Sequence, residues 1–194
     1  MALPRAFYVR PTVEVARDLL GKTLVHRTPD GLASGRIVEV EAYLGEDDPA
    51  SHAFRGPRGR AELMFREGGL AYVYFSYGVH YCMNVVTGPA GTGGAVLIRA
   101  LEPLRGVALM RRRRAREPLT ELASGPGKLA QALAIGPEQN GLSLLKSSLS
   151  LQPGAAPASI AESPRIGITR AADWPLRFYD PASPHVSRRA SSRR

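Results

Sequence analysis

The sequence predicts an α+β fold built on an antiparallel sheet. Runs rich in β-forming residues follow one another through short turns, and the segments with helical spacing are grouped apart from them. This order argues against a doubly wound parallel sheet, in which strands and helices alternate along the chain. The length of 194 residues, at about 150 residues per domain, corresponds to one domain.

The elements can be placed in order from periodicity and turn residues. Apolar residues at helical spacing predict a first helix over 12–20 that ends at Gly21. Pro29, Asp30 and Gly31 are typical of a hairpin loop between the first two strands. The expected strands cover 22–27, 36–43, 71–76, 79–86, 95–100, 165–169 and 176–179, and the expected later helices cover 104–117 and 127–135.

The composition excludes several classes of protein. Hydrophobic residues make up 44% and charged residues 22% of the chain, as in ordinary globular domains. Cys82 is the single cysteine, so neither an internal disulfide nor a cysteine-pair metal or redox motif can form. There is no run of about 18 apolar residues, and residues 1–10 do not resemble a signal peptide. We therefore expect a protein of a reducing compartment without a membrane partner.

The charge favours a polyanionic partner. Lysine and arginine outnumber acidic residues 26 to 17, which leaves a net charge of +9 and makes nucleic acid a leading candidate. Part of this charge lies in residues 185–194, a Ser/Arg-rich segment that we expect to be a flexible tail after a single domain over 1–184. A second arginine cluster lies at 111–116.

Two carboxylates and a tyrosine share one face of an expected strand. Alternation along 36–43 places Glu39, Glu41 and Tyr43 on the same side. A solvent-facing strand side would explain the glutamates without any function, but Tyr43 at the strand end fits that explanation less well. His52 follows in the loop 45–59, where it can meet the end of this strand.

The expected hairpin over 71–86 carries aromatic residues up to its tip at Tyr77 and Gly78. An aromatic side chain at a tip cannot be buried in its own sheet, so Tyr77 needs another partner, such as a base stack. With 77–78 as a two-residue turn, Tyr74 and Asn84 would lie on opposite faces, and only a bulge or another register could bring them together. Asn84 and Arg99 are polar residues in apolar strands, and each needs a ligand or a neighbour.

Glycine-rich segments do not form a known nucleotide loop. Ser124, Gly125 and Pro126 precede Gly127, Lys128 and an apolar run, which is typical of a helix start that can bind a phosphate. Leucines at 122 and 129 exclude a Walker loop, and the glycines at 88–94 lack dinucleotide-binding spacing. The four histidines form no zinc motif. We therefore expect neither a metal nor a cofactor.

Several motifs in the same order resemble the alkyladenine (3-methyladenine) DNA glycosylase family. The resemblance runs from about residue 10 to Tyr179 and covers nearly the whole domain. It rests on GRIVEVEAYLG at 35–45, His52, YVY at 72–74, YG at 77–78, CMN at 82–84, LIRALEP at 97–103, SGP at 124–126 and PLRFY at 175–179.

The resemblance implies a metal-independent enzyme with a curved antiparallel sheet. Such an enzyme rotates a damaged purine out of duplex DNA and hydrolyses its N-glycosidic bond in base-excision repair. It implies alkylated purines as substrates, with deaminated and etheno purines as further candidates. Apart from the resemblance, we expect a monomeric, cytoplasmic protein of bacterial type that is associated with the nucleoid through DNA binding. The implied roles are general base for Glu41, water binding for Arg99, base-pocket walls for Tyr43, His52 and Tyr74, purine screening for Asn84, and DNA intercalation for Tyr77. The helix start at Gly127 and Lys128 is expected, from its own pattern, to contact a DNA phosphate.

A second interpretation is a non-catalytic protein that binds DNA damage through the same aromatic hairpin and basic surface. Both interpretations predict salt-dependent binding to duplex DNA. They differ in base release, which only the enzyme performs. A lyase that forms a Schiff base is not favoured, because the lysines, at positions 22, 128 and 146, lie outside the motifs of the resemblance, apart from Lys128 beside SGP.

Overall fold

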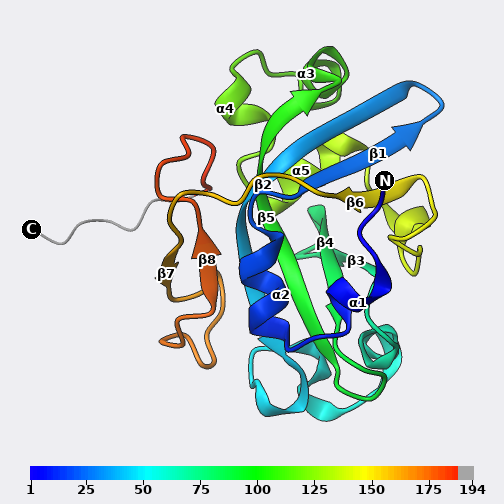
Figure 1. Ribbon diagram of the computed structural model, residues 1–194, viewed down its shortest axis with the longest axis vertical. Helices are drawn as coiled ribbons and strands as arrows, with labels where there is room; N and C mark the ends of the chain where they lie inside the picture. Colours follow the sequence, from blue (N-terminus) through cyan, green and yellow to red (C-terminus); the bar gives the residue numbers. More distant parts are fainter. Residues whose placement is uncertain (188–194) are drawn as a thin grey trace, which may run out of the picture.

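The structure is a computed structural model and describes residues 1–187. It is a single mixed α+β domain around an open antiparallel sheet, as the sequence predicts (Figure 1). The main strand order is β3-β4-β5-β2-β1-β6, and β8 pairs with both β2 and β7. The strands are β1 (Thr23–Thr28), β2 (Gly31–Leu44), β3 (Ala71–Ser76), β4 (His80–Thr87), β5 (Gly94–Arg105), β6 (Leu149–Gln152), β7 (Ala161–Ser163) and β8 (Arg177–Tyr179).

Helices cover both sides of the sheet. In the view of Figure 1, α2 lies in front of the sheet and α5 behind it, with α3 and α4 at the top. The first loop between helix and strand depends on Gly21, whose φ is +84° and where a Cβ atom would lie 2.0 Å from the carbonyl oxygen of Ala155. The helices are α1 (Arg5–Tyr8), α2 (Thr12–Leu19), α3 (Val107–Arg114), α4 (Leu119–Leu122) and α5 (Pro126–Leu133).

The central strand β2 has three partners, which determines where the site can form. Along one edge β2 pairs with β5 from Ser34 to Leu44. Along the other edge its first half pairs with β1, and its residues Glu39 to Glu41 pair with β8. The register with β5 shifts on both sides of Glu39. The backbone at Glu39 to Glu41 is therefore paired on both edges, and both glutamate side chains are buried.

The core has two parts. The larger cluster joins both faces of the sheet to the helices, for example through Leu19 of α2, Met110 of α3 and Leu129 of α5. The smaller cluster packs the 3₁₀ turns after β2 against β3, β4 and β5, and its members are Ala53, Met64, Tyr72, Val86 and Ala95. These turns span Gly45–Asp47, His52–Arg55 and Gly59–Phe65. The smaller cluster thereby fixes the wall that carries His52.

Several predicted boundaries are wrong, for identifiable reasons. Residues 165–169 form no strand but an irregular loop between β7 and β8, because Arg165 turns inward to pair with Asp48. The predicted helix over 104–117 begins only at Val107, since β5 continues to Arg105 beside β2. The strand β6, which pairs with β1, was not predicted, although Leu149 and Leu151 alternate with polar residues and are the buried side chains of the strand.

The hairpin of β3 and β4 has a three-residue loop instead of the two-residue turn. Ser76 pairs with His80, so Tyr77, Gly78 and Val79 form the loop. Both Tyr77 and Gly78 have positive φ angles. In this register Tyr74 pairs with Cys82 and lies two residues from the next pair on the same face, Tyr72 and Asn84. The register therefore places Tyr74 and Asn84 on one face.

The expected tail at 185–194 falls mostly outside the described residues, which end at Ser187. His185 is buried, and Ser187 contacts Glu39. Within residues 1–187, no helix combines the length and the apolar character that crossing a membrane requires.

Candidate active site

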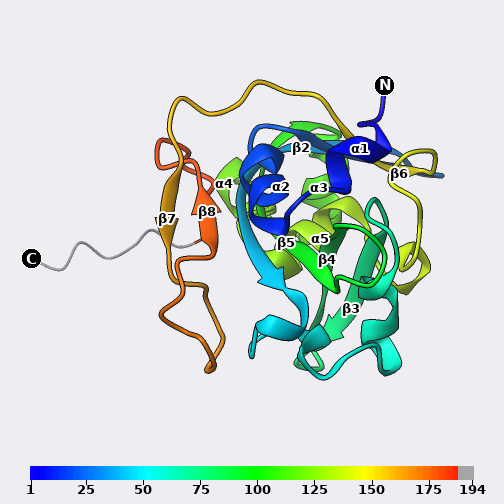
Figure 2. The same ribbon diagram turned by 60° about the horizontal axis from the view of Figure 1, so that its bottom comes forward.

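A cavity of about 810 Å³ opens between β3, β4 and β5, the 3₁₀ turns after β2, and the loop between β7 and β8. In Figures 1 and 2 this last loop lies beside the segment that follows β2, although more than 110 residues separate them in the chain. The cavity wall includes six of the predicted site residues: Tyr43, His52, Tyr74, Tyr77, Asn84 and Arg99. The fold therefore brings together residues from positions 43 to 99 in one space.

Glu41 is not itself a lining residue of the cavity and lies directly behind three residues that are, namely Tyr43, Arg99 and Ile166. Its side chain is fully buried. Oε2 accepts a hydrogen bond from the Tyr43 hydroxyl (3.0 Å), and Oε1 accepts one from the backbone N–H of Ile166 (2.7 Å). Arg99 Nη1 lies 3.3 Å from Oε1. Since all three donors line the cavity, the carboxylate is held in a fixed orientation at its edge.

Burial determines the proton affinity of Glu41. Removal from water raises the pKa of the Glu41 carboxyl above its ordinary value of 4.5. The nearby Arg99 guanidinium and the hydrogen bonds from Ile166 and Tyr43 act in the opposite direction, and the negative charge of Glu39 adds a smaller upward contribution. The net result is a carboxylate that accepts a proton more readily than one in water.

Tyr43 is held from both sides. Its hydroxyl binds Glu41, and the guanidinium carbon of Arg165 lies 4.6 Å from its ring centroid, a cation–π geometry. Arg165 forms a fully buried ion pair with Asp48, in which Nη2 donates to Oδ1 at 2.8 Å. This ion pair joins the loop after β7 to the loop after β2 and thereby closes the cavity beside Glu41.

The rings of His52, Tyr72 and Tyr74 form another part of the cavity wall. The ring centroids of His52 and Tyr74 are 4.6 Å apart, and those of Tyr72 and Tyr74 are 5.4 Å apart. His52 Nδ1 and the Tyr72 hydroxyl oxygen are 2.8 Å apart, within hydrogen-bonding distance. Partial desolvation in this wall, together with the positive charge of Arg60, lowers the pKa of His52 below 6.5. His52 is therefore predominantly neutral at pH 7.

Asn84 lies on β4, lines the cavity and is buried. Its Nδ2 donates to the carbonyl oxygen of Tyr72 across the strand pair (3.1 Å). Arg99 is buried as well and donates from Nε to Glu39 (3.0 Å). The neighbours that both polar side chains were expected to need are thus present.

Tyr77 lies at the cavity rim with 84% of its surface exposed. Its hydroxyl donates to the carbonyl oxygen of Gly167 in the opposite loop (3.1 Å). No side chain of its own sheet covers the ring to any large extent. The side chain therefore remains available at the entrance, as the sequence predicts for a tip aromatic.

Gly127 and Lys128 lie in the first turn of α5, next to the cavity-lining Pro126. A Cβ atom at position 127 would lie 2.5 Å from Cγ of His80, so glycine allows α5 to approach β4 closely. Lys128 is exposed and donates from Nζ to Ser124 Oγ (3.4 Å). Neither residue lines the cavity itself, and both lie at its border.

Comparison with known proteins identifies the family to which this architecture belongs. The family described as Methylpurine-DNA glycosylase (MPG) matches residues 6–184, which is nearly the whole chain. The chain belongs to the methylpurine-DNA glycosylase family. It is therefore a DNA glycosylase, an enzyme of base-excision repair with DNA as its substrate.

This glycosylase is similar to its relatives over most of the length of both chains. A protein of Methanoculleus marisnigri is 54% identical over 194 residues, covering 97% of this chain and 100% of the relative. Proteins of Chlorobaculum parvum (52%, covering 93% and 88%) and Granulibacter bethesdensis (51%, covering 98% and 90%) are similarly close. Each is described as "Putative 3-methyladenine DNA glycosylase". Family membership decides for the enzyme against the non-catalytic alternative.

The glycosylase site also contains residues to which the sequence analysis assigned no role. Ile166, Arg165 and Asp48 hold Glu41 and Tyr43, but they come from loops whose contacts span 117 to 125 residues of sequence. Gly167, a glycine with a φ of +79°, is the one local signal that 165–169 is not a regular strand. Within residues 1–187, no group of three or more His, Cys, Asp or Glu side chains is arranged to hold a metal ion.

Proposed function

We propose that this glycosylase removes alkylated purines from duplex DNA by taking the damaged nucleotide into the cavity, where Glu41 activates the attacking water. The observation that carries the proposal is the buried Glu41 carboxylate, oriented by three donors at the wall of an aromatic cavity. The cavity has a volume of about 810 Å³, within the range of about 300 to 1,000 Å³ that is common for small-molecule sites.

The proposed reaction uses the carboxylate in two ways. As the bond between C1′ and the base nitrogen breaks, the sugar acquires positive charge, which a nearby carboxylate stabilises. The water oxygen bonds to C1′, Glu41 takes the water proton, and the base leaves with the bonding electrons. Arg99 would hold the water. Glu41 has no exposed surface in the free protein, so the proposal requires that nucleotide entry opens a path to one carboxylate oxygen.

The aromatic wall suits a damaged purine. An alkylated purine carries a positive charge, which the faces of Tyr43 and Tyr74 would attract by about 0.5 to 2 kcal/mol. The same charge makes the base a good leaving group without acid catalysis. Neutral deaminated or etheno purines need hydrogen bonds instead, which neutral His52 and Asn84 could supply. We infer that these two residues select among purines.

The rim would engage the duplex. Extrusion of a nucleotide costs a few kcal/mol, and Tyr77 would offset this cost by stacking in the vacated space. Gly127 and Lys128 would contact a phosphate from the start of α5. All these groups come from one chain, so a monomer suffices for the proposed reaction.

Base release under single-turnover conditions tests the proposal. Wild type and Glu41→Gln are compared on duplexes that contain 7-methylguanine, 1,N⁶-ethenoadenine or hypoxanthine. We expect release of the alkylated base by wild type, and release at least about 100-fold slower by Glu41→Gln, because general-base catalysis contributes roughly 10²- to 10⁴-fold. Equal release by both proteins would contradict the role of Glu41.

A further inference from the structure

A second buried carboxylate lies behind Arg99, on the side away from Glu41. Glu39 is fully buried, and its Oε1 accepts hydrogen bonds from Arg99 Nε (3.0 Å) and Arg177 Nε (2.7 Å). Ser187 adds two more donors: its backbone N–H bonds to Oε2 (2.6 Å) and its hydroxyl bonds to Oε1 (2.9 Å). The Ser187 hydroxyl also lies 3.4 Å from Arg99 Nη2. Nothing in the proposed reaction itself uses Glu39 or Ser187.

We propose that Glu39 and Ser187 are positioning residues that hold Arg99 in the orientation in which it serves Glu41. This inference rests on the proposed function. In the planar guanidinium, Nε and Nη2 share one edge, and that edge faces Glu39 and Ser187. Nη1 alone then faces Glu41, at 3.3 Å.

The orientation matters because arginine and carboxylate prefer a two-point contact. An unrestrained guanidinium would form two parallel hydrogen bonds with Glu41. Oε1 already accepts from Ile166 and faces Arg99 Nη1, and Oε2 accepts from Tyr43. A second bond from Arg99 would therefore fill the remaining lone pair of Oε2 and leave none to accept the water proton. With one edge bound by Glu39 and Ser187, Arg99 makes a single contact with Glu41. Glu39 also pairs with both Arg99 and Arg177, and the charges of Glu39 and Glu41 together balance these two buried guanidinium groups.

The topology supports this role. Strand β8 pairs with β2 at Glu39 to Glu41 and brings Arg177 and the following segment to the glutamates. Ser187 lies 148 residues from Glu39 in the sequence and only eight after Tyr179, the end of β8. The segment after β8 is thereby a structural part of the active site.

The test compares Ser187→Ala, Ser187→Thr and Glu39→Gln with wild type in single-turnover base release from a duplex containing 1,N⁶-ethenoadenine, or another base that wild type releases. We expect Ser187→Ala to lower the rate about 3- to 10-fold, the effect of one hydrogen bond, and Ser187→Thr to restore it because the hydroxyl is retained. Glu39→Gln is expected to lower the rate roughly 100-fold, as for a misplaced catalytic group.

Binding provides the readout that distinguishes positioning from a general structural role. The dissociation constant for the same duplex is measured with each substitution in the Glu41→Gln background, where hydrolysis is blocked. We expect an unchanged constant, since Ser187 and Glu39 do not line the cavity. Unchanged rates for Ser187→Ala, equal losses for the alanine and threonine variants, or weakened binding that accounts for the rate loss would each overturn the inference. If wild type releases no base, or Glu41→Gln releases it equally well, the proposed function fails instead.

Discussion

At the scale of single residues, the site contains two buried carboxylates with different surroundings. Glu39 receives hydrogen bonds from two arginines and Ser187. Glu41 has fewer donors, and burial raises its pKa. The ionised form that the proposed reaction needs is therefore less stable in the folded protein than in water. Such a loss of stability is common at the active sites of enzymes.

Glu41→Gln is accordingly expected to stabilise the protein at neutral pH. The pKa of Glu41 is raised in the folded state, so burial of its charge lowers the free energy of unfolding above the folded pKa and has no effect below about pH 4.5, where both states are protonated. A pKa that is higher by one in the folded state than in the unfolded state lowers the free energy of unfolding by about 1.4 kcal/mol at high pH. Thermal unfolding of both proteins between pH 4 and 8 measures this difference. A variant that is less stable at pH 7 would contradict the raised pKa.

The sequence identifies which residues line the site but not how they are held. Strand alternation and the family resemblance point to Glu41, Tyr43 and Arg99. The alternative that Glu39 and Glu41 face solvent is wrong: both side chains are fully buried, because Arg177 and the loop before β8 contact their carboxylates. Long-range partners such as Ile166 and Ser187 leave no local signal.

At the scale of elements, the β3–β4 hairpin presents Tyr77 at its tip. Tyr77→Ala is expected to slow base release roughly 5- to 150-fold, since stacking of one base on an aromatic ring contributes about 1 to 3 kcal/mol. Tyr77→Phe retains the ring and loses only the hydrogen bond to Gly167, so we expect it to keep most of the wild-type rate. Single-turnover release measures both. Equal losses in the two variants would show that the hydroxyl, and not stacking, matters.

The elements were predicted best where the pattern is local. The first helix was expected over 12–20 and is found at Thr12–Leu19, because its apolar spacing alone determines the buried face. The hairpin loop at Pro29 and Asp30 is also confirmed. The loop of the second hairpin was predicted one residue too short, because Val79 belongs to the loop although a β-branched residue is typical of a strand.

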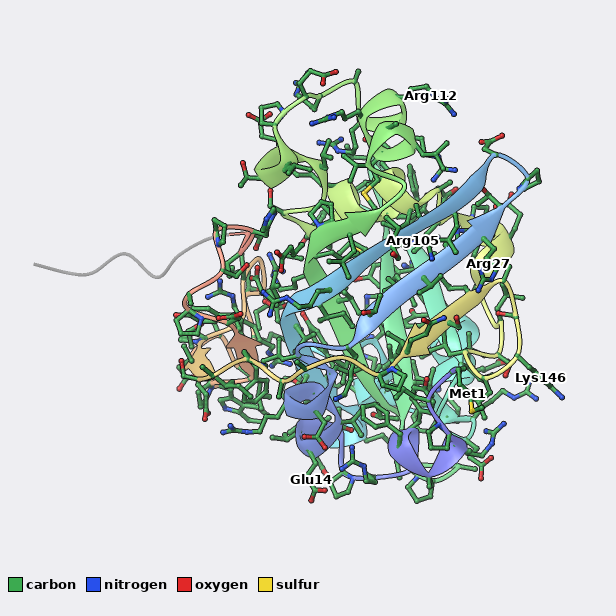
Figure 3. The ribbon with its side chains drawn as sticks, turned by 45° about the horizontal axis from the view of Figure 1, so that its top comes forward. Met1, Glu14, Arg27, Arg105, Arg112 and Lys146 are labelled. Atoms are coloured by element: carbon green, nitrogen blue, oxygen red, sulfur yellow. The ribbon has the colours of Figure 1, made fainter. Side chains whose placement is uncertain are left out.

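At the scale of the whole molecule, positive charge is spread over the surface. Figure 3 shows Arg112 on α3, Arg105 on β5 and Arg27 on β1 distributed across one face, and none of them lines the cavity. Lys128 lies instead beside the cavity border. Net charge alone therefore does not locate the DNA-binding surface, although it agrees with the family's substrate.

The salt dependence of DNA binding distinguishes Lys128, beside the cavity, from the arginines that lie elsewhere on the surface. Each phosphate contact contributes about −0.9 to the slope of log K against log salt concentration. We expect Lys128→Gln to reduce the magnitude of this slope by about 1, and Arg112→Gln, a matched loss of one exposed positive charge, to leave it unchanged. Fluorescence anisotropy of a labelled duplex at several salt concentrations gives the slopes. Identical slopes for both variants would exclude Lys128 as a phosphate contact.

The central claim is that the cavity receives the extruded base and places its C1′ atom beside residue 41. A crystal structure of Glu41→Gln bound to a duplex with 1,N⁶-ethenoadenine tests it most directly. The account predicts the damaged base among Tyr43, His52 and Tyr74, with C1′ facing the side chain of residue 41 and Tyr77 in the duplex. A base that remains stacked in the duplex, or lies outside this cavity, would contradict it.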